Sequence, residues 1–394
     1  MVRLAFAPVC LAAAVPGAVG AATLIASHYS GQLYTLSLSS TNQLAIAETV
    51  SSGNRMPAWL GLDSESRTVY VPDEVGTWGG QPLLKSFSVA ADGSLTAKAQ
   101  VQTAGGDLHS TLYGGSDGKG FIAMAQYDAS TITTYALPLG ASSGQAALQK
   151  LAFTMSQPGP VPSRQDKPHP HSVFTDPSGR FLLSADLGAD LIRVFSIGSA
   201  GQLTQCPSFP AGRGDGPRHG AFYTRGNASF LYTVNELSNS VSSWSVAYPA
   251  ATAGGCLDLV RMQTVSTFPA GRTAPAGSKA AEVHVKGAFV YASNRYDRSF
   301  GPQEDSIATY SIDPSSGRAA FVELTSAFSY FPRTFSINGA GDLVAIGGQT
   351  SASVAVVERN ATTGRLGKLV ASIRVGSPGN VNQEDGLSAV VWNE

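Results

Sequence analysis

Four segments of the chain repeat one pattern of hydrophobic and polar positions. In each segment a turn residue is followed by a short apolar run, and an Asp or Asn ends that run. The segments are 66–74, 179–187, 228–236 and 287–295, with weaker copies that end at 126–127 and 348–349 and one more at 23–29. Self-similarity of this kind predicts a repeat architecture for the whole chain.

The copies are regularly spaced along the chain. The polar position that ends the apolar run recurs at 28, 73, 126, 186, 235, 294 and 348, so one repeat is about 53 residues long. After each copy, apolar and polar residues alternate, as they do in 191–197, 241–246 and 307–312. Alternation with a period of two marks half-buried strands, and clusters of Gly, Ser, Asp and Pro separate each from the next strand.

These patterns predict an all-β fold, a seven-bladed β-propeller with four-stranded antiparallel blades. Seven copies fit the length of 394 residues. An array of β-sandwiches is the alternative, but it would need linkers between modules, and we see none in the sequence. Residues 22–39 supply only part of a blade and 387–392 supply one more strand. We therefore expect the two ends to share the seventh blade and residues 21–394 to form one domain.

Composition and charge limit the class of partner. Charged residues make up only 13% of the chain, and 43 Gly and 22 Pro argue against a long-helix or coiled-coil protein. With 26 basic and 27 acidic residues the net charge is −1, which removes the electrostatic case for nucleic acid or an anionic membrane as the main partner. We expect a monomer that acts on a small-molecule substrate.

The N-terminus has the features of a secretory signal peptide over residues 1–20. Arg3 precedes an apolar stretch of about a dozen residues, and small residues at Ala18 and Gly20 would allow cleavage before Ala21. A membrane anchor or a buried strand is the alternative, but Pro16 interrupts the run, which is shorter than the ~20 residues needed to span a bilayer. We expect a secreted, extracellular protein.

Cysteine usage agrees with export. Cleavage would remove Cys10 and leave Cys206 and Cys256, an even pair that suits one disulfide in an oxidising compartment. Two unrelated buried thiols remain an equal alternative on spacing alone. Two sequons, at Asn227 and Asn360, predict glycosylation in turn-like sequence.

Candidate chemistry gathers at two positions of the repeat. In a propeller, the start of each inner strand and the end of the following strand meet at one mouth of the axial channel. The first position carries His169, His171, Arg218 and Arg333, and the second carries Glu74, Glu236, Arg295 and Gln349. Guanidinium groups bind carboxylates in a bidentate manner, and a His or Glu beside them could transfer protons. The pattern therefore predicts a site for a small anionic ligand.

A purely structural explanation competes for part of this set. The Asp or Asn of each repeat, as at Asp73 and Asn235, is more often a turn-capping residue than a ligand. His169 and His171 could coordinate zinc, but the spacing indicates no third ligand, so we expect no metal site. No phosphate-binding Gly-rich loop and no Gly-x-Ser-x-Gly nucleophile motif is present.

Five motifs together resemble a known family, the seven-bladed β-propeller lactonases, which includes propeller-type 6-phosphogluconolactonases and fungal 3-carboxy-cis,cis-muconate cyclases. They are Lys-Pro-His-Pro-His at 167–171, Gly-Asp-Gly-Pro-Arg-His at 214–219, Tyr-Thr-Val-Asn-Glu-Leu at 232–237, Tyr-Ala-Ser-Asn-Arg at 291–295 and Phe-Pro-Arg-Thr-Phe at 331–335. The resemblance covers nearly all of the chain after residue 20. It departs most in the first blades, where 105–127 lacks the usual Pro before its His.

The resemblance implies a site of one His, two Arg and one Glu. Carried over to this chain, these are His171 or His169, Arg218, Glu236 and Arg295. The arginines would hold a carboxylate or a carbonyl oxygen, and Glu236 or His171 would act as the acid or base. As catalytic groups we predict His171, Arg218, Glu236 and Arg295, and as substrate-binding groups His169, Arg333, Glu74 and Gln349.

Two reaction directions follow from the resemblance, and neither needs a cofactor. One is hydrolysis of a carboxylate-bearing lactone, and the other is cyclisation that forms such a lactone. Export favours an extracellular sugar-acid or aromatic-derived lactone over the intracellular substrates of the named family members. The alternative is a secreted, non-catalytic propeller that binds a small anionic or lipidic ligand. Convergence of the four catalytic candidates within hydrogen-bonding reach around an open cavity would favour an enzyme, and a Glu236 walled off from the cavity by side chains would rule one out.

Overall fold

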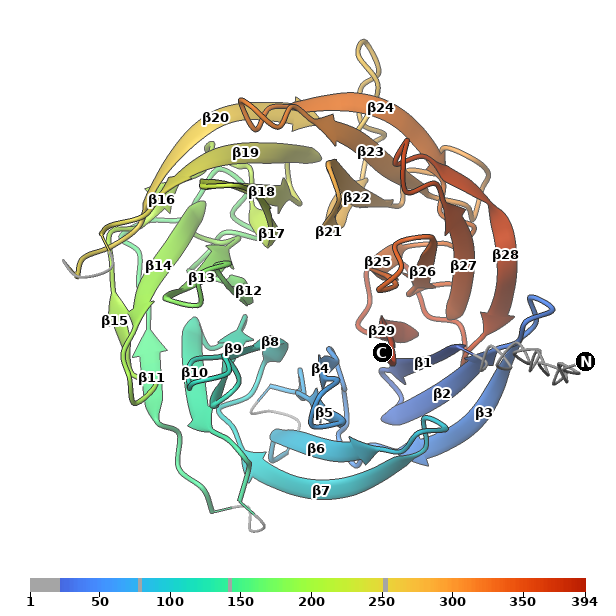
Figure 1. The fold of residues 1–394 in the computed structure, drawn as a ribbon, viewed down its shortest axis with the longest axis horizontal. Coiled ribbons are helices and arrows are strands. Elements are labelled where there is room, and N and C mark those ends of the chain that lie inside the picture. The colour runs from blue at the N-terminus through green and yellow to red at the C-terminus, as the bar shows by residue number, and fades with distance from the viewer. Residues whose placement is uncertain (1–21, 77–79, 141–143, 251–253) are drawn as a thin grey trace, which may run out of the picture.

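The computed structural model describes residues 22–76, 80–140, 144–250 and 254–394. Within these residues it contains 29 strands and no helix. The strands form seven sheets arranged around a central axis, as Figure 1 shows. No helix long and apolar enough to cross a membrane occurs among the residues described. The predicted signal peptide at 1–20 lies outside them.

Each sheet is an antiparallel blade whose first strand lies nearest the axis (Figure 1). The first three blades in chain order are β4 (Gly61–Asp63), β5 (Thr68–Val71), β6 (Leu83–Val89) and β7 (Leu95–Gln102); β8 (Asp107–Tyr113), β9 (Phe121–Gln126), β10 (Thr131–Ala136) and β11 (Gln149–Ala152); and β12 (Pro170–Thr175), β13 (Phe181–Asp186), β14 (Leu191–Ile197) and β15 (Leu203–Gln205), with the short β16 (Phe209–Pro210) also paired to β14.

The remaining blades repeat this order, and the last closes the ring. They are β17 (Pro217–Arg225), β18 (Ala228–Asn235), β19 (Ser240–Ala247) and β20 (Asp258–Ser266); β21 (Lys279–Lys286), β22 (Phe289–Arg295), β23 (Ser306–Ile312) and β24 (Ala319–Ser326); β25 (Pro332–Ile337), β26 (Leu343–Gly348), β27 (Ser353–Arg359) and β28 (Leu366–Arg374); and β29 (Leu387–Trp392) with β1 (Ala22–His28), β2 (Gln32–Leu38) and β3 (Leu44–Ser51).

The prediction that the two ends share one blade is therefore confirmed. Strand β29 pairs with β1 in antiparallel register, with Leu24 opposite Trp392. The hydroxyl groups of Ser27 and Ser388 join the two strands at 2.8 Å. Closure packs the last blade against both of its neighbours, so the apolar blade faces that an open array would expose at its two ends are buried.

Apolar side chains of neighbouring blades pack against each other and form the core. The middle strands are buried on both faces, as β13 is along its whole length. The outer strands are buried on one face only, so β20 alternates between covered and exposed positions and leaves Val260 57% exposed. Burial of these apolar faces supplies the main driving force for the ring.

A repeated Tyr–Gly joint links successive blades. The hydroxyl of Tyr232 donates to the Gly317 carbonyl of the next blade at 2.7 Å, and Tyr291 donates to the Gly364 carbonyl at 2.6 Å. Both glycines have a φ near +70°, and a Cβ atom at Gly317 would lie only 2.1 Å from the Phe230 ring. The turns between third and fourth strands therefore require Gly, which explains part of the high Gly content.

The disulfide and the sequons lie away from the axis. Cys206 and Cys256 form a disulfide bond with a Cα–Cα distance of 5.7 Å, just after β15 and just before β20 of the next blade. Asn227 and Asn360 are exposed in turns, and glycosylation of both stays a prediction. Of the two alternatives for the cysteines, the disulfide is the one that the structure contains.

Candidate active site

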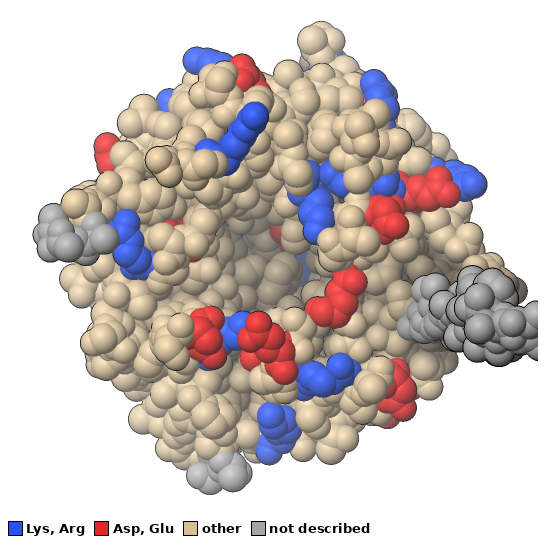
Figure 2. Space-filling view, viewed as in Figure 1, with Lys and Arg blue, Asp and Glu red and all other residues tan. Residues whose placement is uncertain are grey.

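The start of each inner strand and the end of the second strand meet at one mouth, as predicted. Pro217 lies opposite Asn235, Pro332 opposite Gly348, and Lys279 opposite Arg295. The mouth encloses a cavity of about 320 Å³. Seen along the axis, the surface is hollowed at the centre of the ring, and acidic and basic side chains stand around the hollow (Figure 2).

A β-bulge at the start of the inner strand directs side chains into this cavity. In three blades the residue that the pairing skips follows a Pro: His171 between Pro170 and Ser172, Arg218 between Pro217 and His219, and Arg333 between Pro332 and Thr334. All three bulged residues line the cavity. The preceding Pro has no N–H to donate to the ladder, which suits a bulge, and a bulge redirects the side chain that it carries.

The residue just after the recurring polar position supplies the second group of lining side chains. Six of the seven equivalent residues line the cavity: Tyr29, Glu74, Tyr127, Glu236, Arg295 and Gln349. The polar residues before them have structural roles. Asp73 accepts a hydrogen bond from the Met56 backbone N–H at 2.8 Å, and Asn235 donates to the hydroxyls of Ser240 and Ser242 at 2.9 Å. The turn-capping explanation thus holds for Asp73 and Asn235.

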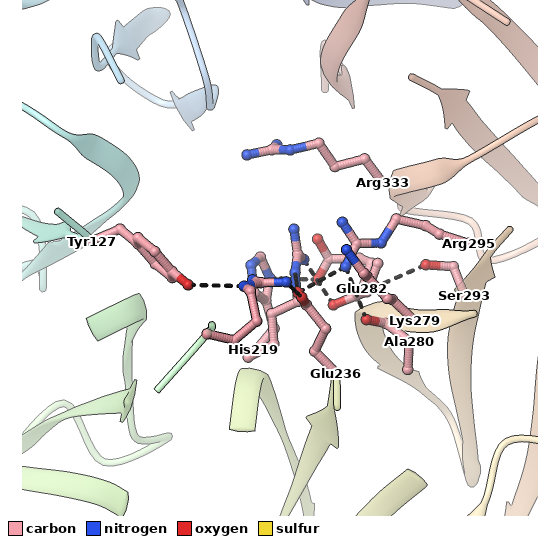
Figure 3. A network of polar contacts seen from close by, with 12 residues as sticks. Tyr127, His219, Glu236, Lys279, Ala280, Glu282, Ser293, Arg295 and Arg333 are labelled. Atoms are coloured by element: carbon pink, nitrogen blue, oxygen red, sulfur yellow. Dashed lines mark hydrogen bonds and ion pairs between the residues drawn. The ribbon is translucent and has the colours of Figure 1, made fainter. Parts of the chain in front are cut away.

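Glu236 lies at the centre of a cluster of guanidinium groups. Its Oε2 atom is 3.1 Å from Arg218 Nε and 2.7 Å from Arg295 Nη2, and its Oε1 atom accepts from Arg164 Nη1. Figure 3 shows Glu236 and Arg295 in this network, with Arg333 extending into the cavity alongside it. Only 1% of Glu236 is exposed and its cationic partners enclose the carboxylate, yet the residue still lines the cavity and is not walled off from it.

This enclosure fixes the charge of Glu236. Burial alone would raise the pKa of its carboxyl group, but the charges of Arg164, Arg295 and Arg218 outweigh burial and hold the pKa far below its ordinary value. The group is ionised at any physiological pH and both oxygens are engaged. Glu236 is therefore suited to hold the arginines in place, and its predicted role as acid or base is not favoured by this geometry.

Glu74 has a different environment on the other side of the cavity. The hydroxyl of Tyr29 donates to Glu74 Oε2 at 2.6 Å, and Arg333 Nη2 lies 3.8 Å from the same oxygen. The side chain is 17% exposed. Burial raises the pKa of Glu74 to about 7, although the charge of Arg333 and the Tyr29 hydrogen bond act in the opposite direction. This carboxyl group can exchange a proton near neutral pH.

Of the two predicted histidines, only His171 lines the cavity. Burial, with the charge of Arg218, lowers the pKa of His171 well below its ordinary value, so the ring is neutral. Its Nδ1 atom is buried and has no hydrogen-bond partner within the described part of the chain. His169 instead stacks on the Tyr127 ring at 4.0 Å and contacts Asp166 Oδ1 through Nε2 at 2.8 Å. It lies behind Tyr127, and its predicted role as a substrate ligand is not favoured.

Gln349 and the segment before β29 form one rim of the cavity. Gln349 Nε2 donates to the Gln383 carbonyl at 2.7 Å, and Lys279 Nζ donates to Asn382 Oδ1 at 2.9 Å. Both donors line the cavity, as do Asn382, Gln383 and Glu384. Glu384 adds a negative charge that raises the pKa of Glu74, after the larger effect of burial.

Several lining residues were not among the predicted site residues. Arg164 comes from the connection between β11 and β12, and the 382–384 segment precedes β29, so neither belongs to a repeated strand. Lys279 begins β21 and Tyr29 follows β1, and both occupy positions that the repeat marks. With these additions, five cations face the cavity together with four acidic groups. Among the described residues no group of His, Cys, Asp and Glu side chains is arranged to hold a metal ion.

Comparisons with known proteins agree on one family. A match to the family described as "Lactonase, 7-bladed beta-propeller" spans residues 18–383. A protein of Arthroderma benhamiae named "Probable 6-phosphogluconolactonase" is 32% identical over 316 residues, which cover 79% of this chain and 75% of that protein. The 6-phosphogluconolactonase of Bacillus subtilis is 28% identical over 318 residues, 78% of this chain and 85% of the other.

A solved structure is similar over nearly the same extent. The periplasmic gluconolactonase PpgL of Pseudomonas aeruginosa matches with a TM-score of 0.74 and 26% identity. The match covers 91% of this chain and 98% of that chain.

Proposed function

The chain belongs to the family of seven-bladed β-propeller lactonases, and we propose that it hydrolyses a sugar-acid lactone in the cavity at the propeller mouth. The observation that carries this proposal is the convergence of His171, Arg218 and Arg295 around that cavity. The similar proteins are named as lactonases, so hydrolysis has support that cyclisation lacks.

The cavity and the similar proteins together suggest the substrate class. A volume of about 320 Å³ is at the lower end of the range for small-molecule sites and suits a single sugar ring. Five cations against four acidic groups, of which Glu74 is neutral part of the time, favour a substrate or product with negative charge. Aldonolactones, with or without a phosphate group, fit these limits and match the names 6-phosphogluconolactonase and gluconolactonase.

The cationic cluster and the histidine would have different roles in hydrolysis. Arg218 and Arg295, held by Glu236, would stabilise the oxyanion that develops on the lactone carbonyl oxygen. His171, which is neutral, would accept a proton from the attacking water. Neither step calls for a cofactor.

We also propose that the protein is exported. The signal-like pattern at 1–20 and the Cys206–Cys256 disulfide support this, because disulfides persist in oxidising compartments. Export favours an unphosphorylated sugar lactone, in keeping with the description of PpgL as a periplasmic gluconolactonase.

One observation favours a second function, that of a binding propeller without turnover. Glu236 is enclosed by three guanidinium groups, which removes one of the two acid–base candidates that the sequence predicts. A cationic mouth could then bind a sugar acid without reacting.

The deciding experiment measures hydrolysis of gluconolactone and 6-phosphogluconolactone by the purified protein, above the spontaneous rate. We expect turnover that falls by about 10²–10⁴-fold in His171→Asn, since general-base catalysis contributes about that factor. His284→Asn is the matched control, because His284 does not line the cavity. Binding of gluconate without turnover by the wild-type protein would favour the binding propeller and overturn the enzyme.

A further inference from the structure

We infer that Glu74 protonates the leaving oxygen when the lactone ring opens, and that Tyr29 positions its carboxyl group for this step. The inference rests on the proposed lactone hydrolysis and adds a second acid–base residue to it, beside His171. Neither role follows from the family's His, Arg and Glu motifs, since Glu74 lies in a different blade from all of them.

The first support is geometric. Glu74 and His171 both line the same cavity, from different blades. The Tyr29 hydroxyl donates a hydrogen bond to Glu74 Oε2 at 2.6 Å, which leaves Oε1 to carry the acid proton. Tyr29 lies in the blade that closes the ring, so the pair bridges two neighbouring blades at the cavity wall.

The second support is the set of charges that faces Glu74 from every element around it. Arg333 approaches from β25 at 3.8 Å, and its Nη1 atom is held by the carbonyls of Ala58 and Ser388 at 3.0 and 2.8 Å. Asp128 after β9 and Glu384 before β29 are both negative, and with burial they oppose ionisation of Glu74. Burial and the two acidic neighbours thus outweigh the one cation, and the pKa of Glu74 rises to about 7.

Water, His171 and Glu74 carry the proton transfers of the proposed step. His171 takes one proton from water while the water oxygen bonds to the lactone carbonyl carbon, and the carbonyl oxygen becomes an oxyanion beside the guanidinium groups. The oxyanion then re-forms the C=O bond, the bond from carbon to the ring oxygen breaks, and Glu74 gives its proton to that oxygen. The products are a carboxylic acid and an alcohol in one chain. Transfer of the proton from His171 to Glu74 through solvent restores the site.

The test is the pH dependence of kcat/KM for gluconolactone, corrected for spontaneous hydrolysis. For the wild-type protein we expect a plateau at low pH and a tenfold fall per pH unit above about 7, since the acid form of Glu74 is the active one. Glu74→Gln should lower the plateau by about 10²–10⁴-fold and remove the alkaline limb. The matched control is Glu358→Gln, which should keep the wild-type profile, because Glu358 of β27 forms a surface ion pair with Lys368 of β28 and does not line the cavity.

Tyr29→Phe tests the pair while leaving the carboxyl group in place. Its hydroxyl favours the ionised form of Glu74, so its loss should move the alkaline limb to higher pH, by up to about one unit. A residue with only a structural role would change the rate without moving the limb. This variant also decides the question if Glu74→Gln does not fold.

Four outcomes would count against the assignment. An unchanged alkaline limb in Glu74→Gln, or a limb that stays in place in Tyr29→Phe, would overturn the role of Glu74 while lactone hydrolysis stands. A limb that rises through pH 7 in the wild-type protein would make Glu74 a base and overturn its role as an acid. A wild-type protein without lactonase activity would overturn the proposed function, and the role of Glu74 with it.

Discussion

Glu236 and Glu74 occupy the same position of the repeat in two different blades, yet they have opposite electrostatic environments. Three guanidinium groups contact Glu236 and hold its pKa far below the ordinary value. One more distant guanidinium and a tyrosine hydroxyl face Glu74, and burial raises its pKa to about 7. Two carboxyl groups whose environments separate their pKa values in this way can divide structural and proton-transfer work between them.

Position in the repeat brings a side chain to the cavity, whereas the residues that surround it there determine what it does. Arg164, which gives Glu236 its third cation, comes from a connection outside the repeated strands. Glu384, which adds negative charge beside Glu74, comes from the segment before β29. Segments outside the repeated strands therefore contribute to the difference in pKa between Glu236 and Glu74.

Loss of the Glu236 carboxylate should have the largest effect. Glu236→Gln leaves three buried or half-buried guanidinium groups without their anion, so we expect a loss near the upper end of ~3–5 kcal/mol in the free energy of unfolding. Urea denaturation at neutral pH measures it. Because the folded-state pKa is depressed, this contribution is complete above the ordinary value of 4.5 and declines as pH falls below it. A loss under about 1 kcal/mol would contradict the anchoring role.

Removal of the disulfide should lower stability without touching either carboxyl group. The bond spans 50 positions on the outer part of the ring, so its loss should cost about 4 kcal/mol through the entropy of the unfolded chain. Cys206→Ala with Cys256→Ala, compared with the wild-type protein by urea denaturation, gives the value. We expect the alkaline limb of the rate profile to stay in place. A shifted alkaline limb would mean that the pKa of Glu74 responds to general loosening of the ring. The difference between Glu74 and Glu236 could then not be assigned to their local contacts alone.

Glu74→Gln should have a smaller effect on stability, and one of the opposite sign at high pH. The folded-state pKa of Glu74 is raised, so the wild-type protein loses stability as pH rises from the ordinary value of 4.5 through about 7. A neutral Gln avoids this loss. The free energy of unfolding of the variant, measured relative to that of the wild-type protein, should therefore increase by about 3 kcal/mol from acidic to alkaline pH. Urea denaturation of both proteins across this range, with Glu358→Gln as control, provides the measurement. A pH-independent difference would contradict the raised pKa.

The fold could be predicted because each blade repeats the same alternation and the same polar position. Equivalent positions in a ring meet at one mouth, so Glu74, Glu236, Arg295 and Gln349 could be placed at a common site from sequence. The sequence could not separate His169 from His171, because residues two apart on a regular strand face the same side. The bulge between Pro170 and Ser172 breaks that rule and sends only His171 into the cavity.

The charge states of the site were beyond sequence reasoning for a related physical cause. A pKa depends on burial and on the charges within a few ångströms. Arg164 reaches Glu236 across 72 positions from a connection without strand pattern, and no repeat spacing indicates where that connection lies. Tyr29 could have been placed at the site from sequence, since it follows the polar position of its own repeat as Glu74 does.

Closure of the ring by β29 also bears on the order in which the two sides of the cavity can assemble during folding. The Glu236 side is built from Arg164, Arg218 and Arg295, all in the middle of the chain. The Glu74 side depends on Tyr29 and on Arg333, which is held by Ser388, and the β1–β29 junction joins residues 361 positions apart. Contacts between such distant positions carry a high loop-closure entropy and form late. We therefore expect the anchored anion to be in place before the ring closes, and the side with the exchangeable proton to be completed last.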